Sequence, residues 1–146
     1  MNLDDYADLH ADLGPNAKAL LRASWNEAAR VLSRSGLETY LRGAQALHAL
    51  GRGPDPVTNF IQEAPGVARE IGEDVLADLV QAALSMSSKT SGAVIALMLA
   101  TAPLAARRLG DAELFRAYLS FLDQLLAQAP RGVRRMLHRL HNELGL

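Results

Sequence analysis

The sequence repeats itself at an offset of 38 residues. Residues 64–76 and 102–114 agree at six of thirteen positions. The identical residues of the first copy are Ala64, Pro65, Ala68, Arg69, Gly72 and Leu76. Each copy begins a short helix with Pro, stops it with Gly, and starts a long amphipathic helix from an acidic cap. A weaker third copy begins at Ala129-Pro130. Periods of about 38 residues are typical of stacked helical hairpins, in which each unit buries its apolar stripe against its neighbour.

Helix-forming residues dominate the chain. Its 146 residues include 25 Ala and 26 Leu, against 7 Val, 3 Ile and 4 Thr. Because Ala and Leu favour helices and β-branched residues favour strands, we predict an all-α fold. Chance agreement among common Ala, Pro and Leu residues would also explain the repeat, but the all-α prediction does not depend on it. We expect one domain over residues 1–146, a right-handed stack of helical hairpins in the form of a HEAT- or armadillo-like bundle or short solenoid.

Proline, glycine and polar caps mark the helix boundaries. Ser35 and Glu38 have the spacing of a capping box. Asp55 and Asp111 are expected N-caps, the first with a proline at the next position. We expect the prolines at 65 and 103 to interrupt helices. The predicted helices lie at about 2–13, 16–33, 35–50, 57–63, 65–72, 74–86, 90–106 with its break at 103, 112–128 and 130–144.

The uncharged run Thr90–Ala106 is the membrane candidate of this sequence. Its seventeen residues contain an interior proline and fall short of the roughly 20 apolar residues that a bilayer needs. A helix that is apolar on all sides is more often the buried centre of a helical bundle. We therefore expect no membrane span and interpret this run as the core helix.

Two observations favour a cytoplasmic location. The N-terminus MNLDDYADLH has no positive region before an apolar stretch, as a targeting signal would. The chain has no cysteine, which excludes disulfides, thiolate metal sites and cysteine nucleophiles and fits a reducing compartment.

No pattern of catalytic or metal-binding residues stands out. The four histidines are His10, His48, His138 and His141, and no third ligand beyond Glu143 accompanies the last two. The string Ser88-Lys89-Thr90-Ser91-Gly92 resembles the end of a phosphate-binding loop but lacks its glycines, so helix capping explains it better. We therefore predict a protein that is not an enzyme and has neither a cofactor nor a metal site.

The last predicted helix is basic and amphipathic. One side carries Arg131, Arg134, Arg135, His138, Arg139 and His141, and the other carries Val133, Met136, Leu137, Leu140 and Leu144. The charge of the whole chain follows the same trend, because residues 1–80 have a net charge of −5 (7 basic, 12 acidic) and residues 81–146 a net charge of +4 (8 basic, 4 acidic).

Three interpretations of this helix remain open. It can dock an acidic protein surface, it can bind polyanions or an anionic membrane, or it can be a terminal packing helix with solvated arginines. A pI of about 6.4 and a single aromatic residue, Phe121, between positions 119 and 146 disfavour nucleic acid. The sequence thus favours a protein partner.

Five strings along the chain resemble one family of activator proteins. They are 36–47 (GLETYLRGAQAL), 51–53 (GRG), 63–74 (EAPGVAREIGED), 88–92 (SKTSG) and 129–134 (APRGVR). In this order they resemble the N-terminal helical region of von Willebrand factor A-containing activators, the NorD/CbbO family. Arg135 departs from the family, which often has proline there. The family's von Willebrand factor A domain is absent from these 146 residues, so its metal-dependent site and client-binding role are not carried over.

The resemblance implies a non-catalytic adaptor. Such an adaptor joins a MoxR-type AAA+ ATPase and couples ATP hydrolysis to remodelling of a client enzyme of the Rubisco or nitric oxide reductase class. Either the ring or the client is the expected direct partner. A free-standing anion-binding module that uses the basic last helix is the alternative. The residues predicted to bind the partner are Arg131, Arg134, Arg135, Arg139, Lys89 and Arg52.

Overall fold

The computed structural model describes residues 2–86, 91–128, 132–143 and 145, and this part of the chain contains helices and no strand. The elements are a 3-10 helix η1 (Leu3–Tyr6) and the α-helices α1 (Ala7–His10), α2 (Pro15–Val31), α3 (Arg34–Ala49), α4 (Pro54–Glu70), α5 (Glu73–Met86), α6 (Gly92–Leu109), α7 (Ala112–Gln128) and α8 (Val133–Glu143). The all-α prediction is confirmed.

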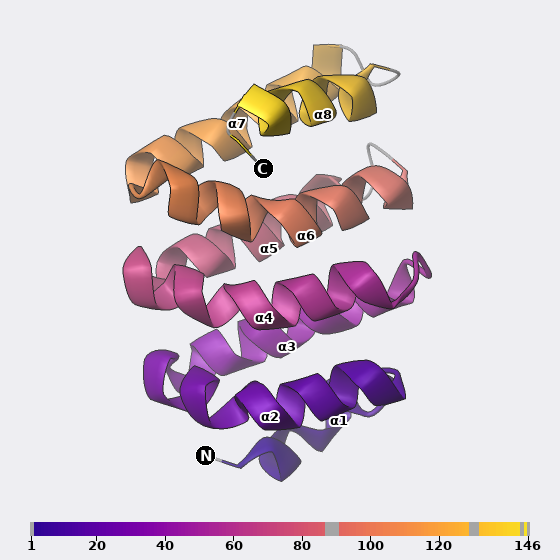
Figure 1. Ribbon diagram of the computed structural model, residues 1–146, viewed down its shortest axis with the longest axis vertical. Coiled ribbons are helices and arrows are strands. Elements are labelled where there is room, and N and C mark those ends of the chain that lie inside the picture. The colour runs from indigo at the N-terminus through magenta and orange to yellow at the C-terminus, as the bar shows by residue number, and fades with distance from the viewer. Residues whose placement is uncertain (1, 87–90, 129–131, 144, 146) are drawn as a thin grey trace.

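The helices form a stack of hairpins. Helices α2, α4, α6 and α8 lie above one another as a front row, and α1, α3, α5 and α7 form a back row behind them (Figure 1). Neighbours within each row pack against each other. We call the successive hairpins layer 1 (η1, α1 and α2), layer 2 (α3 and α4), layer 3 (α5 and α6) and layer 4 (α7 and α8). The predicted hairpin stack is thereby confirmed.

The repeat is visible in three dimensions, with one change of register. In the front row the offset of 38 holds, because Pro65 and Pro103 lie inside α4 and α6, and each helix is followed by a glycine of positive φ, Gly72 at +128° and Gly110 at +66°. In the back row the offset is 39. Helix α5 begins directly after Gly72, whereas Asp111 stands as a cap between Gly110 and α7.

The prediction that proline interrupts two helices is wrong. Helices α4 and α6 run without a break through buried prolines. Proline has no N–H, so Pro65 cannot bond to the carbonyl of Ile61 one turn earlier. The hydroxyl of Tyr40 in α3 donates to that carbonyl instead, at 2.8 Å. Tyr40 thus satisfies the acceptor that the proline leaves unpaired.

Two predicted caps are displaced by two residues. Helix α3 begins after Ser33, not Ser35, and α4 begins after Gly53, with Pro54 rather than Pro56 at its first position. Gly53 has a φ of +88°, which favours glycine over any residue with a side chain. The predicted cap of α7 is confirmed, because the backbone N–H of Leu114 donates to the Asp111 carboxylate at 3.0 Å.

The start of α3 is closed by the next layer. The Ser33 side chain accepts a bond from the Gly36 N–H at 3.2 Å. Glu73, the first residue of α5, accepts from the Ser33 N–H at 2.8 Å and from its hydroxyl at 2.7 Å. The acidic half of this cap, predicted at Glu38, therefore comes from a different helix. The two Ser33 donors, chiefly the backbone N–H, hold the pKa of the Glu73 carboxyl below its ordinary value.

Ion pairs connect the layers along the front row. Arg69 of α4 pairs with Glu27 of α2. Arg107, at the equivalent position of α6, reaches Glu63 at 2.6 Å and both carboxylate oxygens of Glu70 at 3.0 Å. These pairs are partly exposed, so each stabilises the fold only modestly, but they fix the register of one layer on the next.

Helix α6 is the centre of the stack. It is long and apolar enough by length and composition to cross a membrane, and 56% of its most apolar window is buried inside the protein. It contacts α4, α5, α7 and α8. The far end of the stack is built differently, because the indole of Trp25 in α2 packs against the Tyr6 ring of η1, with the centroids 5.5 Å apart.

We expect Tyr40→Phe to lower the free energy of unfolding by about 1–3 kcal/mol, because it leaves the buried Ile61 carbonyl without a donor. Urea denaturation measures the loss. In a Pro65→Ala background the restored N–H of residue 65 can bond to Ile61, so the same Tyr40 substitution should cost much less. An equal cost in both backgrounds would show that the hydroxyl does not compensate for the proline.

We also expect Glu73→Gln to weaken the acid dependence of stability. Because the folded-state pKa of Glu73 is lowered, the unfolded chain binds its proton more readily. The stabilisation is therefore complete above the ordinary carboxyl pKa of 4.5 and disappears as the pH falls through the folded-state value. Denaturation midpoints measured from pH 7 downward should converge for wild type and E73Q. Ser33→Ala keeps the backbone donor and should fall between them; parallel curves would contradict this account.

Candidate interaction surface

Three of the predicted site residues are exposed in the structure. Arg135 and Arg139 are exposed on α8, and Arg52 is exposed in the α3–α4 connection. Arg134 belongs to α8. Arg131 and Lys89 lie outside the described residues.

Where the structure describes its side chains, helix α8 has the predicted amphipathic orientation, with one exception; those of Arg131, Val133, Arg134, His141 and Leu144 lie outside the described part. Leu137 is buried and Leu140 half-buried, and both pack towards the core. Arg135 and Arg139 face solvent and make no ion pair with any described residue. Met136, predicted on the buried side, is 41% exposed. The basic side is thus free to meet a partner.

The other predicted contact, the α3–α4 connection, lies beside the start of α6, at the right of Figure 1. A Cβ atom at Gly92 would lie 3.3 Å from Leu50 and 4.0 Å from the Arg52 Nε atom. Arg52 therefore lies beside Gly92, the last residue of the string 88–92. Gly92 is the residue of the pair 91–92 in that string that begins α6.

A groove of about 400 Å³ reaches from Arg52 to His138 of α8, and we call it the front groove. It lies between the start of α4, the outer side of α6 and α8. Helix α6 contributes three alanines together with Leu97 and Thr101, and Arg52 and His138 supply nitrogen atoms to the lining. Its lining residues are Arg52, Asp55, Pro56, Asn59, Ala93, Ala96, Leu97, Ala100, Thr101 and His138. This arrangement suits an extended or helical peptide that carries carboxylates.

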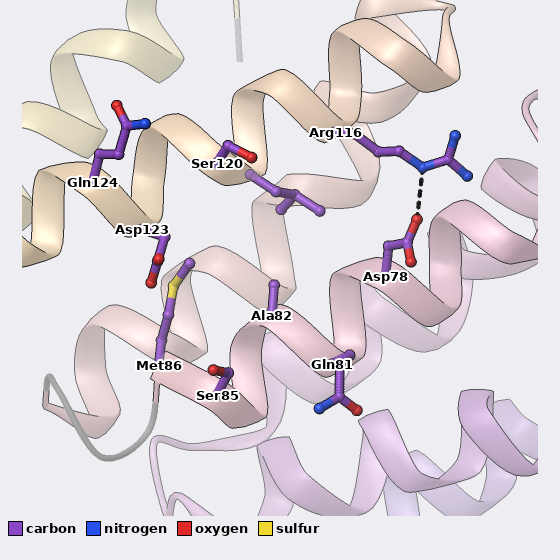
Figure 2. Close-up of a pocket in the computed structure, with 10 residues that line it drawn as sticks. Asp78, Gln81, Ala82, Ser85, Met86, Arg116, Ser120, Asp123 and Gln124 are labelled. Carbon is purple, nitrogen blue, oxygen red and sulfur yellow. Dashed lines mark hydrogen bonds and ion pairs between the residues drawn. The ribbon is translucent and has the colours of Figure 1, made fainter.

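A second groove runs between α5 and α7 on the back row, and sequence reasoning missed it. Figure 2 shows its side chains, with Asp78 and Arg116 paired across the two helices at 2.8 Å. The groove measures about 630 Å³ and also contains Ser85, Ser120 and Asp123. The Asp78 carboxylate raises the pKa of Arg116 through their hydrogen bond. Asp78 and Arg116 lie 38 residues apart whereas the back row repeats at 39, so the pair is recognisable only once the register of α5 and α7 is known.

The shifted pKa values have structural causes. The hydrogen bond from Arg107 lowers the pKa of Glu70, and the bonds to Glu70 and Glu63 raise the pKa of Arg107. Burial raises the pKa values of Tyr40 and Tyr118. Among the residues that the structure describes, no three His, Asp or Glu side chains are grouped so that they could hold a metal ion.

Comparisons with protein-family models, with curated proteins and with solved structures find no match to this chain. The interpretation of its surfaces therefore rests on the residues themselves.

Charge reversal tests the pair in the back groove. We expect Asp78→Arg to lower the denaturation midpoint slightly, because it places two cations together at the α5–α7 contact. The double variant D78R/R116D should recover most of the loss, and high salt should shrink both effects. A double variant no more stable than D78R would show that the pair does not hold α5 against α7.

Proposed function

We propose that this chain is a non-catalytic protein-interaction module that binds a partner through the basic side of α8. The observation that carries the proposal is the exposure of Arg135 and Arg139, which have no acidic partner among the described residues, on a helix fixed to the core by Leu137. Charges held on a rigid element, and not neutralised within the protein, are suited to steering and orienting an acidic partner.

The front groove supports the same function. It extends from His138 of α8 across α6 to Arg52, so that one partner segment in the groove can contact both α8 and the α3–α4 connection. The Ala residues of its floor allow a partner backbone to approach α6 closely. A stack tied together by Glu73, Arg107 and other contacts between layers presents this surface as one rigid unit.

The sequence resemblance suggests the partner. We propose that the chain serves as the adaptor part of an activator that couples a MoxR-type AAA+ ATPase to remodelling of a client enzyme, of the Rubisco or nitric oxide reductase class. The resemblance in residues 36–47, 63–74 and 88–92 supports this assignment.

An anion-binding module for nucleic acid or membrane is the second candidate, supported by the same exposed arginines. The acidic residues beside them, Asp55 in the groove and Glu143 on α8, argue for a partner with a mixed charge pattern rather than a uniform polyanion. The two functions differ in their salt dependence, because binding to a polyanion weakens steeply as salt displaces the condensed counterions.

The test is co-sedimentation of the chain with the MoxR-type ATPase of the same organism, with and without ATP. We expect R52E/R135E/R139E to weaken co-sedimentation by about tenfold or more, the equivalent of about 1.4 kcal/mol. Reversal of three other exposed arginines, R22E/R30E/R42E in α2 and α3, applies the same change of net charge away from α8 and should leave binding intact. Circular dichroism should show equal helicity in both variants.

Two results would contradict the proposal. Equal losses in both triple variants would mean that only net charge matters. Separation of the wild-type chain from both the ring and the client in every nucleotide state would remove the adaptor function. Retention on duplex DNA or anionic vesicles, lost steeply with salt, would favour the second candidate.

A further inference from the structure

Layer 4 exposes three large apolar side chains on its outer helices. Leu114 and Phe121 of α7 are 54% and 50% exposed, and Met136 of α8 is 41% exposed. A single exposed apolar residue needs no explanation. For these three, the equivalent positions of the earlier layers are filled by residues that are buried or packed against the core.

The offset of 39 residues shows which positions of α3, α5 and α7 in the back row are equivalent. At an offset of 39, five positions are buried in all three helices, which shows that α3, α5 and α7 present the same side to the core. These positions are Leu37, Leu76 and Phe115; Tyr40, Leu79 and Tyr118; Leu41, Val80 and Leu119; Ala44, Ala83 and Leu122; and Leu47, Met86 and Leu125. In this register Leu114 corresponds to Val75 and Gly36, and Phe121 corresponds to Ala82 and Gly43.

The positions of Gly36 and Gly43 face the following layer. A Cβ atom at Gly36 would collide with the carboxylate of Glu73, which belongs to α5. A Cβ atom at Gly43 would lie 2.6 Å from Phe60 of α4 and 3.1 Å from Val80 of α5. Leu114 and Phe121 therefore occupy the positions over which, in layer 2, helix α5 lies.

The front row gives the same result. At its offset of 38, Met136 corresponds to Phe60 and Met98, which are 0% and 1% exposed. Phe60 and Val80 of layer 3 both lie beside Gly43, so Phe60 lies near the contact between successive layers. In layer 4 the corresponding methionine has no following layer among the described residues.

The side chains at these positions grow from layer to layer. Gly36, Val75 and Leu114 form one series, and Gly43, Ala82 and Phe121 form the other. Lower layers approach each other closely because the positions are small. Layer 4 instead presents the large side chains of Leu114 and Phe121, and large apolar side chains often anchor protein interfaces.

We propose that the outer side of α7 and α8, defined by Leu114, Phe121 and Met136, binds an amphipathic α-helix of a protein partner, in the position that α5 takes on α3 and α7 takes on α5. We infer a helix as the occupant because, in both of these contacts inside the stack, a helix packs on the same side of the helix before it. Its apolar stripe carries small residues opposite Leu114 and Phe121, which lie seven residues or about two turns apart. Arg139, three residues after Met136 on α8, matches acidic residues along the edge of that stripe.

This inference goes beyond the proposed function, because it concerns the apolar side chains Leu114, Phe121 and Met136 and the structural class of what binds there, and Arg139 is the one residue that both surfaces share. The front groove and the basic side of α8 can fail to bind the ATPase while the outer side of α7 still accepts a helix, and the reverse also holds.

The test uses a synthetic helical peptide of the same length as α7, with alanine at two stripe positions seven apart, leucine at the others and glutamate along one edge. A peptide of equal composition in scrambled order is its control. Since the chain has no cysteine, a single Cys at Ala117, exposed between Leu114 and Phe121, can carry an environment-sensitive fluorophore. We expect saturable binding of the ordered peptide and none of the scrambled one.

Matched variants locate the contact. L114S/F121S should weaken peptide binding by at least tenfold, whereas L84S/L104S, which alters two apolar residues exposed elsewhere, should leave it unchanged. Equal binding by both variants, or by both peptides, would overturn the proposal. Sedimentation of the wild-type chain as a dimer that L114S/F121S dissociates and the peptide does not disturb would also overturn it, because the occupant would then be a second copy.

Discussion

Every helix of this protein depends on the layer next to it. Polar contacts connect successive layers, as the apolar contacts do. Ser33 begins α3, but the carboxylate that completes its cap belongs to Glu73 of the next layer. Arg107 of α6 forms ion pairs with Glu63 and Glu70 of the preceding layer. Such a stack derives its stability from contacts between nearest neighbours, so no layer is a separate structural unit.

The repeat and the dominance of Ala and Leu were sufficient to predict the fold, because periodicity and helix propensity are properties of the local sequence. The errors concern bonds between distant residues. Pro65 is tolerated because of Tyr40, which lies 21 positions away in the chain and was not recognisable as its partner. The start of α3 is set by Glu73, forty positions away, so the local capping box at Ser35 and Glu38 was misleading.

The candidate site was also predictable in part. The helical period placed Arg135 and Arg139 on the exposed side of α8, which the structure describes in that orientation. Met136 was assigned to the buried side because the period gives the direction of a side chain but not whether another layer covers it. The back groove and its Asp78–Arg116 pair were missed because two isolated charges give a signal only after the register of α5 and α7 is known.

The contact of Trp25 with Tyr6 has an optical consequence. Trp25 is the only tryptophan of the chain and lies in layer 1, at the end opposite α7. Indole fluorescence therefore reports on the opening of that end, whereas the ellipticity of the backbone averages over all layers. The two signals coincide only if the stack opens in one step, so their separation measures how far cooperativity extends from one end of the molecule to the other.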